Sequence, residues 1–132
     1  MQRISLNAVE PLSPAGTIRY LPVMTDAHCI VLCTVPDAAT GESLARALVE
    51  ARLAACVNII PGLTSIYRWK GEVHQDNELL LIAKTRRDRF EALSVMLSGL
   101  HPYELPEIIA VPITNGRPAF LSWIDHTLEH PT

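Results

Sequence analysis

The sequence contains little cysteine, few aromatic residues and no excess of basic charge. Its three cysteines, Cys29, Cys33 and Cys56, are few and odd in number, which argues against a disulfide framework. The net charge of -3 is opposite to what phosphate contacts require, so we expect no nucleic-acid partner. No apolar run reaches the roughly 20 residues of a transmembrane helix, and no secretory signal is visible. These absences predict a cytoplasmic protein with no membrane partner.

Common enzyme motifs are also missing. The chain has no glycine-rich phosphate loop, no Gly-x-Ser-x-Gly and no His-Glu-x-x-His. Its acidic residues show no pairing that would suggest acid–base chemistry. We therefore predict a protein that is not an enzyme and that carries no organic cofactor.

What the chain does contain is a long predicted β-hairpin. Its arms span residues 55–69 and 72–84, and Lys70-Gly71 forms a two-residue turn in which glycine supplies a positive φ. This turn predicts that Trp69 faces Glu72, Tyr67 faces His74 and Ile60 faces Leu81. Pro61-Gly62 interrupts the first arm and favours a β-bulge.

The remaining elements flank this hairpin. Residues 29–35 form a buried strand, and a helix capped by Asp37 follows it. Thr85 and Asp88 resemble a capping box ahead of a helix from Phe90 to Leu100. Residues 107–113 form a fourth strand, and Pro118 begins a last helix. The order predicts an α+β, ferredoxin-like βαββαβ domain over residues 27–132 with an additional C-terminal helix. The proline-broken residues 1–26 are interpreted as a flexible tail.

The predicted strands do not alternate between apolar and polar residues. Apolar runs occur at residues 30–32, 79–83 and 108–111. A ferredoxin-like sheet carries helices on one face only. If the other face were exposed to solvent, apolar and polar residues should alternate along each strand. The pattern therefore predicts that other subunits cover the second face.

Two groups of residues suggest binding chemistry. Cys29 and Cys33 lie about 13 Å apart along a strand, whereas two thiolates on one zinc-like ion lie within about 5 Å, so this pair cannot share an ion. Aromatic and polar residues near the hairpin suggest either a ligand cleft between subunits or a subunit contact. The candidates are Tyr67, Trp69, Lys84, Tyr103 and Glu107. Glu78 and Glu107 are expected to pair with Arg68 and Lys84.

Three motifs together resemble the CutA family of small divalent-cation-tolerance proteins. They are LAACVNIIPG, the Tyr-x-Trp-x-Gly ending at Gly71, and HPYELPE. The resemblance implies a ferredoxin-like subunit in a homotrimer that acts in tolerance of copper and other divalent metals. It also implies that Cys33 and His101 are copper ligands, although Leu100 stands where members with this site carry a second histidine. The alternatives are a trimeric sensor of anionic metabolites, similar in architecture to PII proteins, and a scaffold that anchors another protein.

Overall fold

A computed structural model describes residues 27–129, so the predicted tail lies outside the described residues. The elements are β1 (His28–Val35), α1 (Ala38–Glu50), β2 (Cys56–Trp69), β3 (Glu72–Arg86), a 3₁₀ turn (Arg87–Arg89), α2 (Phe90–Leu100), β4 (Ile109–Pro112) and α3 (Pro118–Glu129). The strands form one antiparallel sheet in the order β2-β3-β1-β4. The ferredoxin-like α+β prediction is confirmed, although β4 is shorter than predicted and β3 extends two residues further.

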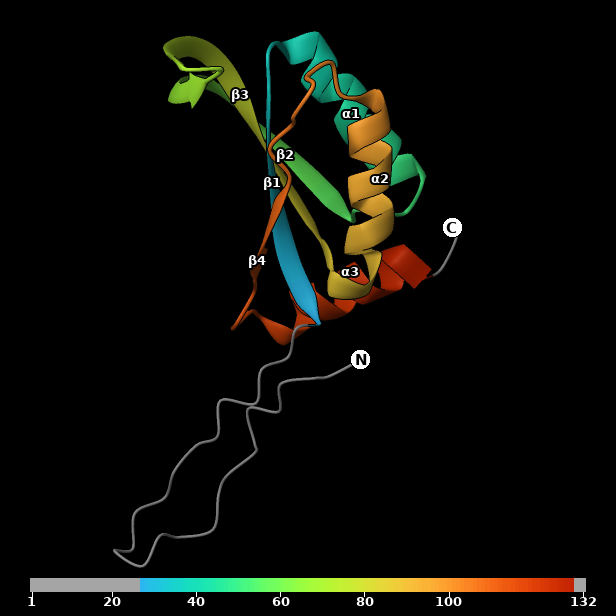
Figure 1. The fold of residues 1–132 in the computed structure, drawn as a ribbon. Coiled ribbons are helices and arrows are strands. Elements are labelled where there is room, and N and C mark those ends of the chain that lie inside the picture. Colours follow the sequence, from blue (N-terminus) through green and yellow to red (C-terminus); the bar gives the residue numbers. More distant parts are fainter. Residues whose placement is uncertain (1–26, 130–132) are drawn as a thin grey trace, which may run out of the picture.

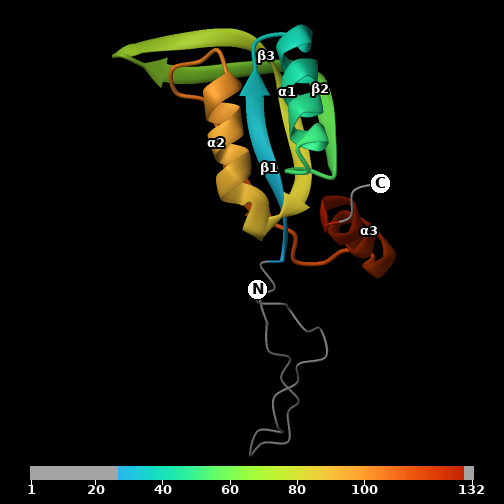
Figure 2. The ribbon, with the colours of Figure 1, turned by 90° about the vertical axis from the view of Figure 1, so that its right-hand side faces the viewer.

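The sheet and its helices form two layers. Both α1 and α2 lie against the same face of the sheet, whereas α3 lies across one end of it (Figure 1). Viewed from the helical side, the β2–β3 hairpin extends beyond the rest of the domain (Figure 2). None of the helices in residues 27–129 has the length and apolar character needed to cross a membrane.

The core lies between β1 and the two helices. Alternate side chains of β1, from Cys29 to Val35, are almost fully buried against Leu48 of α1 and Leu93 of α2. Helix α1 begins where predicted, because the Asp37 carboxylate accepts a hydrogen bond of 2.7 Å from the Thr40 backbone N–H. That bond holds the pKa of Asp37 below its usual value.

The hairpin turn is correctly predicted, but the register is correct for the outer half only. Lys70 and Gly71 both have positive φ, 50° and 83°, as a type I′ turn requires. Tyr67 pairs with His74, as expected, and Ile60 pairs with Leu80 rather than with Leu81. The reason is the bulge: two residues, Pro61 and Gly62, oppose a single residue of β3, which shifts the inner half by one position.

The capping-box prediction at Thr85 is wrong. Thr85 is the penultimate residue of β3, it is fully buried, and its hydroxyl donates to the Leu53 carbonyl at 2.7 Å. Asp88 instead accepts two hydrogen bonds from the Arg86 guanidinium, at 3.2 and 2.6 Å. Thr85 continues strand β3 instead of capping a helix. Its β-branched side chain is favoured in a sheet, and its hydroxyl is satisfied by the Leu53 carbonyl.

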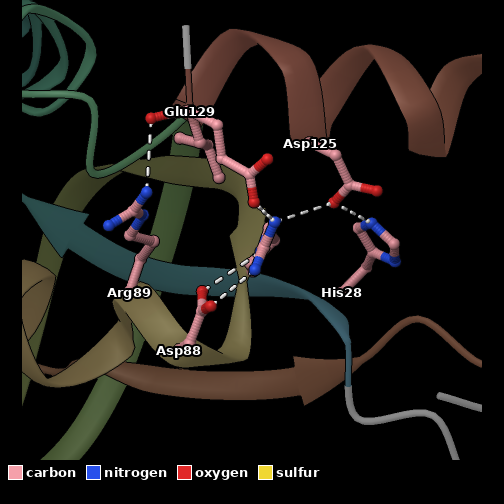
Figure 3. A network of polar contacts seen from close by, with 7 residues as sticks. His28, Asp88, Arg89, Asp125 and Glu129 are labelled. Atoms are coloured by element: carbon pink, nitrogen blue, oxygen red, sulfur yellow. Dashed lines mark hydrogen bonds and ion pairs between the residues drawn. The ribbon is translucent and has the colours of Figure 1, made fainter. Parts of the chain in front are cut away.

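Helix α3 is anchored to the end of β3 by an ionic network around the buried Arg86 side chain (Figure 3). The Arg86 side chain is 7% exposed and contacts Asp88 together with two carboxylates of α3, Asp125 at 3.4 Å and Glu129. His28 also lies 2.9 Å from Asp125. An apolar cluster of Ala55, Leu121, Ile124 and Leu128 completes this contact.

The face of the sheet opposite the helices is apolar. We call it the open face, and it consists of Ile30, Leu32, Ile60, Leu80, Ile82, Ile109 and Val111, which share one side of the sheet by strand pairing. Ile109 is 50% exposed, Ile60 46% and Val111 40%, while the others are half-buried. No helix of the described chain lies over this face (Figure 1).

Candidate functional site

Two predicted metal ligands, Cys33 and His101, meet at one backbone carbonyl. Cys33 lies in β1 and points into the core, where it is 1% exposed. His101 directly follows the last residue of α2, and it is also buried. The Thr34 carbonyl lies 2.8 Å from His101 Nε2 and 3.7 Å from Cys33 Sγ. The fold therefore brings together residues that are far apart in the sequence.

Both ring nitrogens of His101 are occupied by backbone groups. Nδ1 accepts a hydrogen bond of 3.1 Å from the Tyr103 N–H, so Nε2 must carry the proton that it donates to the Thr34 carbonyl. The ring also lies against Tyr103, with centroids 4.7 Å apart. A metal ion would therefore have to displace one of these hydrogen bonds. Within residues 27–129, no three His, Cys, Asp or Glu side chains are grouped closely enough to hold one ion.

The Cys33 side chain is a protonated thiol at neutral pH. Burial, followed by the nearby charges of Glu107 and Glu78, raises its pKa from 9.0 to about 12. Since the thiolate is both the nucleophile and the metal ligand, the folded protein must release a tightly held proton before Cys33 can bind a metal.

Cys33 should consequently resist alkylation in the folded protein. A pKa raised from 9.0 to about 12 lowers the thiolate fraction at pH 8 by about 1,000-fold, and burial slows the reaction further. Iodoacetamide treatment followed by peptide mass spectrometry should label Cys33 in urea-unfolded chains and leave it unlabelled in folded ones. Rapid labelling of the folded protein would contradict the assigned environment.

The same pKa shift predicts a loss of stability in alkali. Because the folded pKa lies above the unfolded one, Cys33 contributes stability that is complete below about pH 9 and is lost as pH rises toward about 12. The free energy of unfolding of Cys33→Ala should therefore fall less steeply than that of the wild type between these values.

Beside these residues lies a cavity of about 680 Å³ between the hairpin and the loop that follows α2. Four of the predicted cleft residues line it: Tyr67, Trp69, Tyr103 and Glu107. Its other polar lining residues are Thr34, Ser65, Arg68, Asp76, Glu78 and Glu104. We call this space the hairpin cavity, and its volume lies within the usual range for small-ligand sites.

Two tyrosine–carboxylate pairs contribute to the polar lining of the hairpin cavity. The Tyr103 hydroxyl donates to Glu78 at 2.7 Å, and the Tyr67 hydroxyl donates to Asp76. Burial and the Glu78 contact raise the pKa of Tyr103, and the bond to Asp76 raises that of Tyr67. Both hydroxyls therefore keep their protons and remain donors at neutral pH.

Lys84, the fifth predicted cleft residue, does not join the others within one chain. It pairs with Ile30 and Cys56 at the far end of the sheet, and its ammonium group donates to Asn58. It lies six positions beyond Glu78 along β3, which corresponds to about 20 Å of strand. The expected pairing of Glu78 with a basic residue is therefore wrong, since among the described residues its partner is Tyr103.

Sequence reasoning missed the two tyrosine–carboxylate pairs. The signal for one was present, because Tyr67 faces His74 and Asp76 is then its diagonal neighbour across the hairpin. The Tyr103–Glu78 pair had no such local signal, because the two residues come from a loop and a distant strand.

Together, the sheet order and the projecting hairpin define a small ferredoxin-like protein that holds a buried cysteine and a buried histidine against one backbone carbonyl. The family model described as CutA1 divalent ion tolerance protein matches residues 29–127. The chain belongs to this family.

Individual relatives agree with this assignment. The divalent-cation tolerance protein CutA of Thermus thermophilus is 55% identical over 72% of this chain and 92% of its own length. The solved structure of the Thermus thermophilus protein matches with a TM-score of 0.72 at 54% identity, covering 74% of this chain and 94% of that one. A structure described as the periplasmic protein from Archaeoglobus fulgidus matches with a TM-score of 0.75 at 38% identity, covering 77% and 99%. By contrast, the chain spans 56–64% of the length of its mouse, human, frog and Arabidopsis relatives.

Proposed function

We propose that this chain forms a cytoplasmic, non-enzymatic homotrimer that binds divalent metal, copper in particular, and that contributes to metal tolerance. The observation that carries the metal role is the meeting of Cys33 and His101 at the Thr34 carbonyl. Thiolate and imidazole are ligands that suit copper. Glu78 and Glu107 lie close enough to act electrostatically on Cys33, so an incoming cation would also be attracted by their charges.

The same geometry favours a weak to moderate affinity for this site. Binding must remove the Cys33 proton and break a hydrogen bond of His101, and both steps cost free energy. Only two soft ligands are supplied, because Leu100 precedes His101 where a second histidine would add a third. Leu100 is the last residue of α2 and is 56% exposed, so a larger polar side chain can be accommodated there.

Copper binding should require Cys33 and should be strengthened by Leu100→His. We expect Cys33→Ser to weaken binding by at least tenfold, since even losing a residue that only orients a ligand costs roughly 10–100-fold. Calorimetric titration of copper into the wild type and both variants measures this. Equal affinity of the wild type and Cys33→Ser would exclude the site, and Val95→His on the exposed face of α2 is the control for adventitious histidine binding.

Support for assembly comes from the open face. Its apolar side chains remain exposed or half-buried in a single chain, although an isolated antiparallel sheet would carry polar residues there. Both outer strands, β2 and β4, also have a free edge within the described residues, so head-to-tail contacts between copies can close a ring. The count of three follows the family resemblance.

A further inference from the structure

Residues 114–116 connect β4 to α3, and the chain is held by hydrogen bonds on either side of them. The Ile113 N–H donates to the His28 carbonyl at 3.0 Å, and the Leu121 N–H donates to the Arg117 carbonyl at 3.1 Å. Residues 114–116 themselves belong to no helix or strand, are exposed, and donate no backbone hydrogen bond to any described residue. Their N–H groups are therefore left to solvent.

Asn115 and Gly116 form a reactive pair in this connection. Of the asparagines in the chain, Asn115 alone precedes a glycine. An asparagine side-chain amide lies within reach of the next backbone nitrogen, and a following glycine does not hinder that approach, because it has no Cβ. Since the Gly116 N–H makes no hydrogen bond to the described chain, no such bond holds this nitrogen away from the Asn115 side chain.

The packing of α3 favours glycine at position 116. A Cβ built on Gly116 would lie 2.9 Å from Leu121 Cδ2 and 3.0 Å from Leu121 Cγ, which is closer than carbon atoms normally pack. Leu121 packs against the apolar cluster that completes the contact of α3. A larger residue at position 116 would push Leu121 away from this cluster, so the docking of α3 keeps a glycine beside Asn115.

We propose that Asn115 is a site of spontaneous covalent modification in the folded protein, at which the side-chain amide becomes a carboxylate through a cyclic imide. The Gly116 nitrogen attacks Asn115 Cγ and forms a new C–N bond. The Asn115 side-chain nitrogen leaves as ammonia, with the proton that the Gly116 nitrogen gives up. Water then opens the ring: cleavage at Cγ gives aspartate, and cleavage at the main-chain carbonyl gives isoaspartate. Water is the co-reactant, and no oxidant or reductant takes part.

The modification changes the charge and the length of the connection. Either product adds a negative charge shortly before α3 begins at Pro118, where the helix dipole favours a carboxylate. Isoaspartate also adds a backbone carbon between β4 and α3. Because Arg86 and the apolar cluster hold α3 independently of this connection, both products should remain folded. The inference goes beyond the proposed function and depends on neither metal binding nor assembly.

Incubation of the full-length protein in mildly alkaline buffer, followed by peptide mass spectrometry, tests the site. Alkali favours loss of the Gly116 proton, so the peptide that contains Asn115 should exchange the mass of ammonia for that of water. The product should separate into two isomers on chromatography. Asn58 and Asn77 are internal controls that should stay unchanged, since they lie in β2 and β3 and precede residues with side chains.

Comparison of folded and unfolded chains tests the structural part of the inference. Asn115 should react at a similar rate in the native protein and in urea, because the fold does not hold the Gly116 N–H. Asn115→Gln should abolish the conversion in both states, since closure would require a larger ring. Gly116→Ala, measured in urea where the Leu121 contact is absent, should slow the conversion to the rate of Asn58.

Three results would overturn the proposal. The first is reaction of Asn115 in urea without reaction in the native protein, because this would show that the fold protects the pair. The second is no conversion of Asn115 in either state. The third is conversion of Asn58 or Asn77 in the native protein as fast as that of Asn115, because this would show that the connection between β4 and α3 confers no special reactivity.

Discussion

Replacing Arg86 with methionine should lower the free energy of unfolding by about 3 kcal/mol. Methionine keeps much of the apolar length of the side chain but removes the charge that holds Asp88, Asp125 and Glu129 together. The loss falls at the lower end of the range for buried ion pairs, because Asp88 and Glu129 are nearly half exposed and water can solvate them. Urea unfolding at fixed protein concentration measures the change.

The loss of stability in Arg86→Met should be localised to α3. Amide hydrogen exchange in Pro118–Glu129 should increase in Arg86→Met, whereas α1 and the centre of the sheet should keep their protection. Arg86→Lys should fall between the two proteins, since an ammonium group cannot form the two-pronged contact with Asp88. Arg46→Met, at an exposed position of α1, is the matched control. An Arg86→Met protein as stable as this control would contradict the anchoring role.

Replacing Ile82 with aspartate should dissociate the proposed trimer. Ile82 lies in β3, one of the two middle strands of the sheet, and belongs to the open face. It pairs with Leu32 of β1 on one side and with Asn58 of β2 on the other. Burying an aliphatic side chain contributes roughly 1.5–3 kcal/mol, and these side chains are already partly covered, so covering the whole face contributes roughly 5–10 kcal/mol per chain. An unpaired carboxylate at its centre would oppose that burial.

Native mass spectrometry at micromolar concentration should show three chains for the wild type and one chain for Ile82→Asp. Val95→Asp is the matched control, because Val95 is 71% exposed on α2 and its replacement should leave the mass unchanged. A folded wild-type monomer would refute the need for a partner, and a stable dimer would refute the count of three. An Ile82→Asp protein with unchanged mass would place the contact elsewhere.

Local rules predicted the elements well, because each had its own signals. The turn at Lys70-Gly71, the cap at Asp37 and the start of α3 at Pro118 all depend on neighbouring residues, and the structure has them where predicted. Thr85 shows the limit of this reasoning. Its local pattern was typical of a helix cap, but its hydroxyl donates a hydrogen bond to the Leu53 carbonyl, 32 residues away in the sequence.

The candidate sites depend on contacts between residues that are far apart in the sequence, and local sequence patterns do not predict such contacts. Tyr67, Trp69, Tyr103 and Glu107 line one cavity, but Lys84 lies at the other end of the sheet. The hydrogen bonds of His101 and the partners of Glu78 depend on how the loop after α2 returns over the sheet. Residue types identified the candidates, and only the folded arrangement shows which of them share a space.

The bulge at Pro61-Gly62 also determines which side of the hairpin holds the aromatic residues. Before the bulge, odd-numbered residues of β2 such as Val57 and Ile59 pack toward the helices, and Ile60 points to the opposite side with Leu80. The extra residue exchanges this alternation, so that Tyr67 and Trp69 share a side with Asp76 and Glu78. Deleting one residue there would turn both rings toward the helical side and leave the carboxylates without them. The one inserted residue therefore reverses the side to which the odd-numbered residues of β2 point. Val57 and Ile59 pack toward the helices at the base of the hairpin, whereas Tyr67 and Trp69 line the hairpin cavity near its tip.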